Sequence, residues 1–311
     1  MTTRLTPGPM TQGFAAITKP QRAGSSLPLL PRIKQRRPRT VRRGMLWFAV
    51  IWLTVLILAA VFADLIPGLP VYDEKIGSFA QPPDWSVAGL LGTDGIGRSN
   101  LSRIIYGARV SLTIAVASTL IGLVIGLIVG MVGGYYRGLA ETVANIIANT
   151  LSALPPLLLL LALISAIGAS LFGITVALGL VISDLYIRVS KGAVIASANR
   201  EYVLAARALG AGDGRIMIRE ILPNLVPVLG AIIPMAMAIM IVVEGSLSFL
   251  GYGIPAPTPS WGGMIAAGGD IMRQFPWVIV GPVITLFLTV LSFNTVGDYL
   301  SSRTDAREGK L

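Results

Sequence analysis

Residues 200–224 read REYVLAARALGAGDGRIMIREILPN and interrupt a chain that is almost continuously apolar on both sides. The stretch holds four arginines and three acidic residues, so it must lie in water rather than in lipid. Small and apolar residues recur at three- and four-residue spacing in its first half, which predicts a short amphipathic helix with Glu201 in its first turn and Gly210 at its end. Asp213 is then expected to cap a second short helix, and Pro223 to stop it. The sequence therefore predicts a helical hairpin at a membrane surface.

The composition of the whole chain is that of an integral membrane protein. Its 311 residues are 54% hydrophobic and 13% charged, with a mean hydropathy of +0.75, which is too apolar for one soluble core. The chain has no cysteine and no histidine, so disulfides, thiolate nucleophiles, imidazole bases and the usual soft-metal sites are excluded. It also has no G-x-x-x-x-G-K-[ST] motif and hence no P-loop of its own. We therefore expect no catalysis, no metal and no cofactor in this chain.

The net charge of +10 does not indicate nucleic-acid binding, because arginine outnumbers lysine twenty to five, as codon usage in a GC-rich genome produces. Residues 1–44 hold ten lysines or arginines, six prolines and no acid. Such a segment is expected to be mobile, to set orientation and to touch anionic lipid. A cleaved signal peptide is the weaker alternative, because the basic region is too long for one.

Six apolar segments, each near the roughly 20 residues that a bilayer requires, predict transmembrane helices. They are 45–66, 110–132, 143–167, 171–187, 225–250 and 277–296. If the basic tail lies inside, only five of the 25 basic residues fall in segments outside the membrane, so the positive-inside rule places both termini and the hairpin in the cytoplasm. The expected organisation is a basic cytoplasmic tail (1–44), a first span (45–66), an extracytoplasmic segment (67–109), a core (110–300) with its loop at 188–224, and a cytoplasmic C-terminus (301–311).

The hairpin resembles the EAA loop of ABC-importer permeases, whose pattern is E-A-A, three residues, Gly, nine residues and Ile-x-Leu-Pro. Leu204 stands where that pattern has Glu, and Glu220 where it has Ile. Five positions fall in register with it, namely Ala205, Ala206, Gly210, Leu222 and Pro223. In that family the loop sits in a groove on the ATPase subunit, where small alanines give the low profile that a groove needs. An ordinary surface helix between two spans satisfies the local pattern equally well.

The resemblance implies that the loop 200–223 couples the spans to the ATPase. Arg207 and Arg215 are placed to reach acidic groups of that partner. The implied coupling residues are Glu201, Ala205, Ala206, Arg207, Gly210, Arg215, Leu222 and Pro223.

Residues 91–112, LGTDGIGRSNLSRIIYGARVSL, resemble the signature that precedes the second span in the C-type permease of dipeptide and oligopeptide importers. Ser99 replaces the acid usual in that signature, and it is expected to cap a short helix. Asp94 and Arg98 are candidates for the translocation path. A structural brace at the membrane surface is an equally good interpretation of this segment.

Residues 244–263, EGSLSFLGYGIPAPTPSWGG, also resemble that family. Glu244 lies at membrane depth, where an acid is a functional hypothesis by default. Glu244 and Ser248 are path candidates, and a buried hydrogen bond between helices is the alternative role for Glu244. Trp261 is expected to anchor the outer loop in which it lies at the membrane interface.

Glycines recur every four residues in the second span, at positions 122, 126, 130 and 134. One edge of this helix thus lacks side chains, which predicts tight helix packing and, as a weaker alternative, a groove for substrate. Pro155 and Pro156 predict a kink in the third span, facing protein or a water-filled cavity, so Pro155 is a further path candidate. Asp184 lies one turn before Arg188, which predicts a local ion pair.

Three motifs in the family's order imply an all-α, six-helix permease of type I ABC-importer architecture: a MetI-like five-helix core preceded by one extra helix. The resemblance further implies a bacterial inner-membrane protein paired with a homologous second permease, cytoplasmic ATPases that bind the ATP, and an extracytoplasmic binding protein. Dipeptides or oligopeptides are the implied cargo, with nickel complexes or other small ligands as alternatives. An ion-gradient-driven secondary transporter is less favoured, because Glu244 is the one ionisable group offered near the midplane. A membrane-embedded enzyme is weaker still, because His, Cys and a carboxylate cluster are missing.

Overall fold

The computed structural model describes residues 43–308, so the predicted basic tail falls almost entirely outside the described part. These residues are helical apart from connecting loops and two isolated bridges. The helices are α1 (Arg43–Val61), the 3-10 turn η1 (Ala63–Leu65), α2 (Asn100–Tyr136), α3 (Gly138–Ser152), α4 (Pro156–Ile167), α5 (Leu171–Ser197), α6 (Glu201–Ala208), α7 (Asp213–Arg215), the π-helical η2 (Ile216–Ile221), α8 (Leu222–Phe249), α9 (Trp261–Gly268) and α10 (Trp277–Glu308). The predicted all-α membrane class is confirmed.

Five helical segments of the described part are long and apolar enough to cross a bilayer. They are α1, α2, α5, the continuous segment 213–249 and α10. The predicted third span, 143–167, is instead two helices, α3 and α4, whose axes meet at 91°. The predicted kink is thus a complete break: Pro155 is extended (φ −51°, ψ 130°) and Pro156 begins α4, since a proline fits the first turn of a helix but has no N–H for its interior.

Further predicted boundaries were wrong. α5 runs to Ser197, so the first ten residues of the predicted loop 188–224 are helical, and α10 runs past the expected end at 296 to Glu308. α2 begins at Asn100, ten residues before the expected start, so much of the second motif is helical. Ser99 does cap this helix, accepting a hydrogen bond from Ser102 N at 3.3 Å, but the helix is 37 residues long rather than short. Pro223 does not end a helix either: η2 runs directly into α8, and Pro223 lies in the first turn of α8, where the missing N–H is tolerated.

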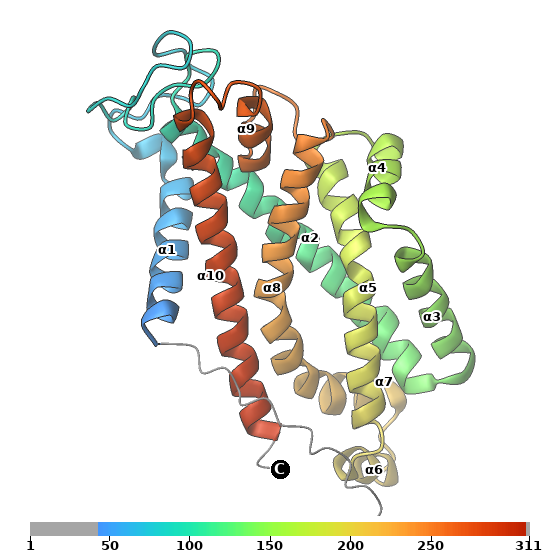
Figure 1. Ribbon diagram of the computed structural model, residues 1–311. Helices are drawn as coiled ribbons and strands as arrows, with labels where there is room; N and C mark the ends of the chain where they lie inside the picture. The colour runs from blue at the N-terminus through green and yellow to red at the C-terminus, as the bar shows by residue number, and fades with distance from the viewer. Residues whose placement is uncertain (1–42, 309–311) are drawn as a thin grey trace, which may run out of the picture. The chain divides into compact units, whose positions relative to one another are not determined.

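α2 crosses behind the other spans and packs along α5 (Figure 1). The glycine stripe makes this approach possible. A Cβ at position 122 would lie 2.3 Å from a methyl carbon of Ile182, and one at position 130 would lie 2.7 Å from Cβ of Ser190. The predicted tight packing is therefore confirmed, because no residue larger than glycine fits between the two helices.

α8, α10 and α1 continue the bundle on the side away from α3 and α4 (Figure 1). The last turn of α1 is tied to α2, where Arg109 donates to the carbonyl of Val61 at 3.0 Å and pairs with Asp64 at 2.7 Å. Tyr106 donates to Asp64 at 2.6 Å, and this bond together with Arg109 lowers the pKa of the Asp64 carboxyl. The hairpin lies at one end of the bundle, and α9 with the 62–99 segment lies at the opposite end.

Candidate functional site

The hairpin begins with α6, which starts at Glu201 and closes at Gly210 as predicted. Gly210 has φ +81°, and its N–H donates to the carbonyl of Arg207 at 3.0 Å. The N–H of Ala211 donates to the carbonyl of Ala206, also at 3.0 Å. These two bonds form a Schellman cap, which requires the left-handed conformation that glycine adopts without strain. Gly210 therefore sets the sharp reversal of the hairpin.

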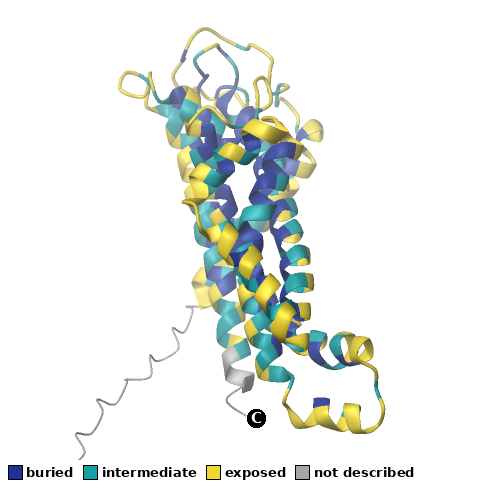
Figure 2. Cartoon of the chain, turned by 90° about the vertical axis from the view of Figure 1, so that its right-hand side faces the viewer, coloured by how far each residue is buried: buried dark blue, intermediate teal, exposed yellow. Residues whose placement is uncertain are grey.

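One face of the hairpin is anchored and the other is free. Val203 and Ile216 are fully buried against the bundle, whereas Leu204 is 49% and Leu209 is 89% exposed. The hairpin extends past the ends of the spans and is mostly exposed (Figure 2). Leu204 and Leu209 therefore lie on the part of the hairpin that the bundle does not cover.

The predicted coupling residues divide between these two faces. Ala206 and Leu222 are half-buried and pack against the core, and the other six are exposed: Glu201, Ala205, Arg207, Gly210, Arg215 and Pro223. Their contact with a partner stays a prediction.

Tyr135, at the end of α2, joins the two limbs of the hairpin: the first limb is α6, and the second is the helical segment that begins with α7. Its hydroxyl donates to Asp213 Oδ1 at 2.7 Å and accepts from Arg207 at 3.2 Å, whose guanidinium lies 5.8 Å from the ring centre. The hydrogen bond with Tyr135 raises the pKa of Arg207. Asp213 was predicted to cap the second helix of the hairpin, but Gly212 occupies the cap position. Sequence analysis missed Tyr135, since nothing in its local pattern sets it apart.

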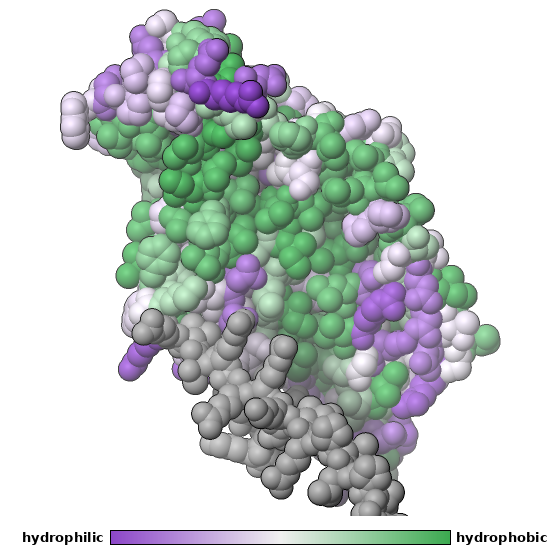
Figure 3. Space-filling view, in the orientation of Figure 1, coloured by the Kyte–Doolittle hydropathy of each residue, from purple (hydrophilic) through white to green (hydrophobic). Residues whose placement is uncertain are grey.

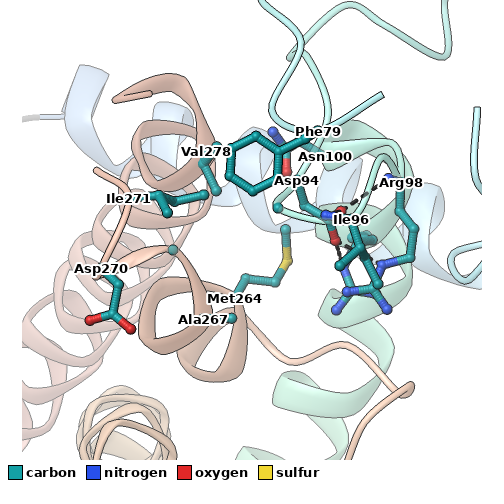
Figure 4. A pocket seen from close by; sticks show the side chains of 13 residues that line it. Phe79, Asp94, Ile96, Arg98, Asn100, Met264, Ala267, Asp270, Ile271 and Val278 are labelled. Carbon is teal, nitrogen blue, oxygen red and sulfur yellow. Dashed lines mark hydrogen bonds and ion pairs between the residues drawn. The ribbon is translucent and has the colours of Figure 1, made fainter. Parts of the chain in front are cut away.

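At the opposite end, Asp94 is a buried acceptor for its own loop. Its Oδ1 accepts the backbone N–H groups of Ile96 at 2.9 Å and Arg98 at 3.0 Å. Its Oδ2 pairs with Arg98 at 2.7 Å and with Arg103 at 3.5 Å. Asp94 thus supplies these arginines with the acidic partner that Ser99, which replaces an acid of the signature, does not. These groups lie on one side of a pocket of about 270 Å³, opposite Ile271 (Figure 4). The geometry favours the brace over a free substrate ligand.

Glu244 bridges α8 and α9. It is 1% exposed, and its Oε1 accepts from the hydroxyls of Ser248 at 2.9 Å and Ser260 at 2.8 Å. Ser260 also caps α9 by accepting from Gly263 N at 3.1 Å. Glu244 Oε2 has no hydrogen-bond partner within residues 43–304. This arrangement matches the alternative role predicted for Glu244, a buried hydrogen bond between helices.

The prediction for Trp261 was wrong. Its side chain is fully buried rather than interfacial, and its indole N–H donates to the carbonyl of Ile104 at 3.0 Å. Its backbone N–H donates to Ser111 Oγ at 3.2 Å. The residue therefore fixes α9 to α2, because a buried tryptophan needs a partner for its single donor.

A polar face formed by α3 and α5 was not foreseen as a unit. The predicted pair of Asp184 with Arg188 is present at 2.7 Å, and Arg188 also donates to Asn149 at 3.2 Å and Ser152 at 3.4 Å. Figure 3 shows this face as a hydrophilic patch over α3 and the adjoining part of α5. The spacing of Asn145, Asn149 and Ser152, four and three residues apart, is the sequence signal that reveals it.

The five predicted path candidates do not form one site. Glu244 and Ser248 are in contact, and Asp94 contacts Arg98, but no hydrogen bond or ion pair in the described part joins these two pairs. Pro155 is exposed at the break between α3 and α4.

Comparison with known proteins gives consistent similarities. The family described as "Binding-protein-dependent transport system inner membrane component" matches residues 122–308. The chain is 35% identical to the Di/tripeptide transport system permease protein DppC of Pseudomonas aeruginosa (strain UCBPP-PA14), covering 83% of this chain and 86% of that one. It is 38% identical to the Dipeptide transport system permease protein DppC of Escherichia coli (strain K12), covering 83% and 87%. A solved chain of the MetNI methionine ABC transporter shares the fold, with TM-score 0.51, 20% identity and coverage of 64% of this chain and 96% of that one.

Proposed function

Because the chain belongs to the family of binding-protein-dependent transport system inner membrane components, we propose that it is a permease subunit of an ATP-driven importer of dipeptides or oligopeptides. The similarity to two dipeptide permeases over 83% of the chain supports the class of cargo. The observation that carries the mechanism is the hairpin, whose exposed leucines sit on an element anchored by Val203 and Tyr135. The hairpin is the surface on which an ATPase subunit docks.

The hairpin is mechanically continuous with the spans. Its second limb and α8 form one helical segment, 213–249, of 37 residues, which at 1.5 Å per residue extends roughly 55 Å. Its first limb is held to α2 by Tyr135, and α2 is packed along α5. A displacement of α6 by the ATPase therefore tilts α8 and the α2–α5 pair together. In this mechanism ATP is bound by the partner subunits, and this chain breaks no bond.

The proposed assembly contains a homologous second permease, cytoplasmic ATPases and a binding protein on the side opposite the hairpin, in a bacterial inner membrane. The excess of basic residues in the tail and the hairpin supports a cytoplasmic location for both. The loops at the opposite end, with the brace at Asp94 and the α9 segment, then face the binding protein. Their internal hydrogen bonds keep that surface in one conformation, which favours docking of a rigid partner.

A permease for nickel complexes or another small ligand fits the same fold, because ligand choice in such an importer rests with the binding protein. A secondary transporter fits less well. It requires ionisable groups that bind the coupling ion near the midplane, and Glu244, which is buried, already accepts two serine hydroxyls.

The test is uptake of labelled dialanine by vesicles that contain the reconstituted importer. We expect uptake to require ATP, the ATPase subunits and the binding protein. Collapsing the ion gradients should leave uptake unchanged. Uptake that needs no ATPase and follows an imposed ion gradient would refute the proposal. Competition by unlabelled peptides of increasing length and by nickel then defines the cargo.

A further inference from the structure

The polar face of α3 and α5 is a ladder of paired charges. Asp184 pairs with Arg188 at 2.7 Å, and Lys191 pairs with Glu141 at 3.8 Å. Amide and hydroxyl groups of α3 add hydrogen bonds to each pair: Ser152 donates to Asp184, Asn149 accepts from Arg188, and Asn145 accepts from Lys191. The ladder therefore carries two acids and two bases and has no net charge.

The Asp184–Arg188 pair of the ladder lies at a depth where the outward side of α2 is apolar. α5 residues 182–190 pack against the α2 segment 122–130. The side chains that this part of α2 turns outward are hydrocarbon, with Val124 55% and Ile128 60% exposed. Lipid-compatible residues and charged residues thus occur at one level on two different sides of the bundle.

The ladder is partly open. The side chains of Arg188 and Glu141 are 49% and 33% exposed, and those of their partners Asp184 and Lys191 are 19% and 18% exposed. A charged group that faces hydrocarbon costs several kcal/mol, so this side of the bundle must meet water or another polar surface. Mutual pairing reduces the cost but does not remove it, because the exposed edges of the ions remain unsolvated in lipid.

We infer that the α3–α5 face lines the water-filled path of the importer and binds the charged ends of a zwitterionic peptide, the carboxylate at Arg188 and the ammonium group at Asp184. This inference rests on the proposed function and assigns that path to a place distinct from Glu244 and Asp94. A neutral ladder of alternating charge suits such a cargo. Each end of the peptide exchanges one ion-pair partner for another, and no net attraction holds the cargo in the path.

The first test is water access, and the absence of cysteine from the chain makes it clean. Asn149→Cys and Ile128→Cys are placed singly in the complete reconstituted importer and treated with a charged methanethiosulfonate, with labelling of this chain scored after the subunits are separated. Asn149→Cys is expected to react and Ile128→Cys to stay unlabelled, although a lipid-soluble maleimide labels it. If Asn149→Cys is unreactive both without nucleotide and with ATP, the face is covered by the second permease and the inference is wrong.

The second test separates ligand binding from a structural ion pair. Arg188→Gln is expected to slow dialanine uptake roughly tenfold, since a hydrogen bond to a charged group is lost. The double variant Asp184→Asn with Arg188→Gln restores a neutral hydrogen-bonding pair, and it should stay slow if the charges bind cargo. Recovery of uptake in the double variant would assign the pair a structural role and overturn the inference. Arg109→Gln, which removes another 2.7 Å Arg–Asp pair, is the matched control and should leave uptake unchanged.

The two tests distinguish failure of the inference from failure of the proposed function. ATP-dependent uptake of dialanine by the unaltered importer together with an unreactive Asn149→Cys would refute the path and leave the importer intact. Absence of ATP-dependent uptake would refute the importer whatever the labelling.

Discussion

Replacing Gly126 with alanine is expected to destabilise the protein, although alanine is the better helix former. The new Cβ would lie 2.3 Å from Cβ of Tyr186 and 2.8 Å from the backbone nitrogen of Ile187. Carbon atoms in ordinary contact are about 3.5 Å apart or more, so α2 and α5 must separate locally by roughly 1.2 Å. Both obstructing atoms belong to the backbone or are fixed to it, and neither can rotate away.

The expected net loss of stability is about 1–2 kcal/mol. Overpacking of a well-packed interface costs roughly 1–3 kcal/mol, and the gain from replacing glycine inside a helix offsets up to about 1 kcal/mol of it. Leucine at the same position should cost more, because its branched side chain has no space to enter between the helices.

The matched control is Gly192→Ala on α5, where an added Cβ meets no atom within 4 Å. This variant should be more stable than the unaltered protein by roughly 0.5–1 kcal/mol, from backbone entropy alone. Denaturant unfolding of the purified variants in detergent, followed by circular dichroism, measures both. If Gly126→Ala proves as stable as Gly192→Ala, the close approach of α2 and α5 does not exist.

Three further predictions concern the hairpin and the buried acid. Tyr135→Phe keeps the ring but removes both hydrogen bonds to the hairpin; a loss of about 1 kcal/mol should speed amide exchange in residues 201–212, and unchanged exchange contradicts the clamp. Gly210→Asp strains a left-handed position, and a bulky residue at Ala206 displaces α6 from the core. Each variant should still insert into the membrane but should uncouple ATP hydrolysis from uptake. Normal transport by both variants would refute coupling through the hairpin. Glu244→Gln retains the acceptor oxygen for both serines, so transport should be preserved, and a large loss would instead indicate that the charge binds cargo.

Local patterns in the sequence were sufficient for much of the architecture. Hydropathy identified five spans, because the roughly 20 residues that a bilayer demands are contiguous in the chain, but it read the broken pair α3 and α4 as one more. The helix end at Gly210 and the packing of the glycine stripe were readable because each depends on a residue type at a particular place in a local pattern. Boundaries were predicted less accurately: Pro223 was expected to end a helix but lies in the first turn of α8, since a proline starts a helix as readily as it stops one.

Contacts between residues far apart in the chain were decided only by the tertiary structure. Tyr135 meets Asp213 across 78 positions, and Trp261 reaches the carbonyl of Ile104 across 157, so neither pairing leaves a local trace. The charged ladder likewise depends on the packing of α3 against α5, which brings Asn149 of one helix to Arg188 of the other. Periodicity along one helix determines which side of that helix is polar, but only packing decides which helix faces it.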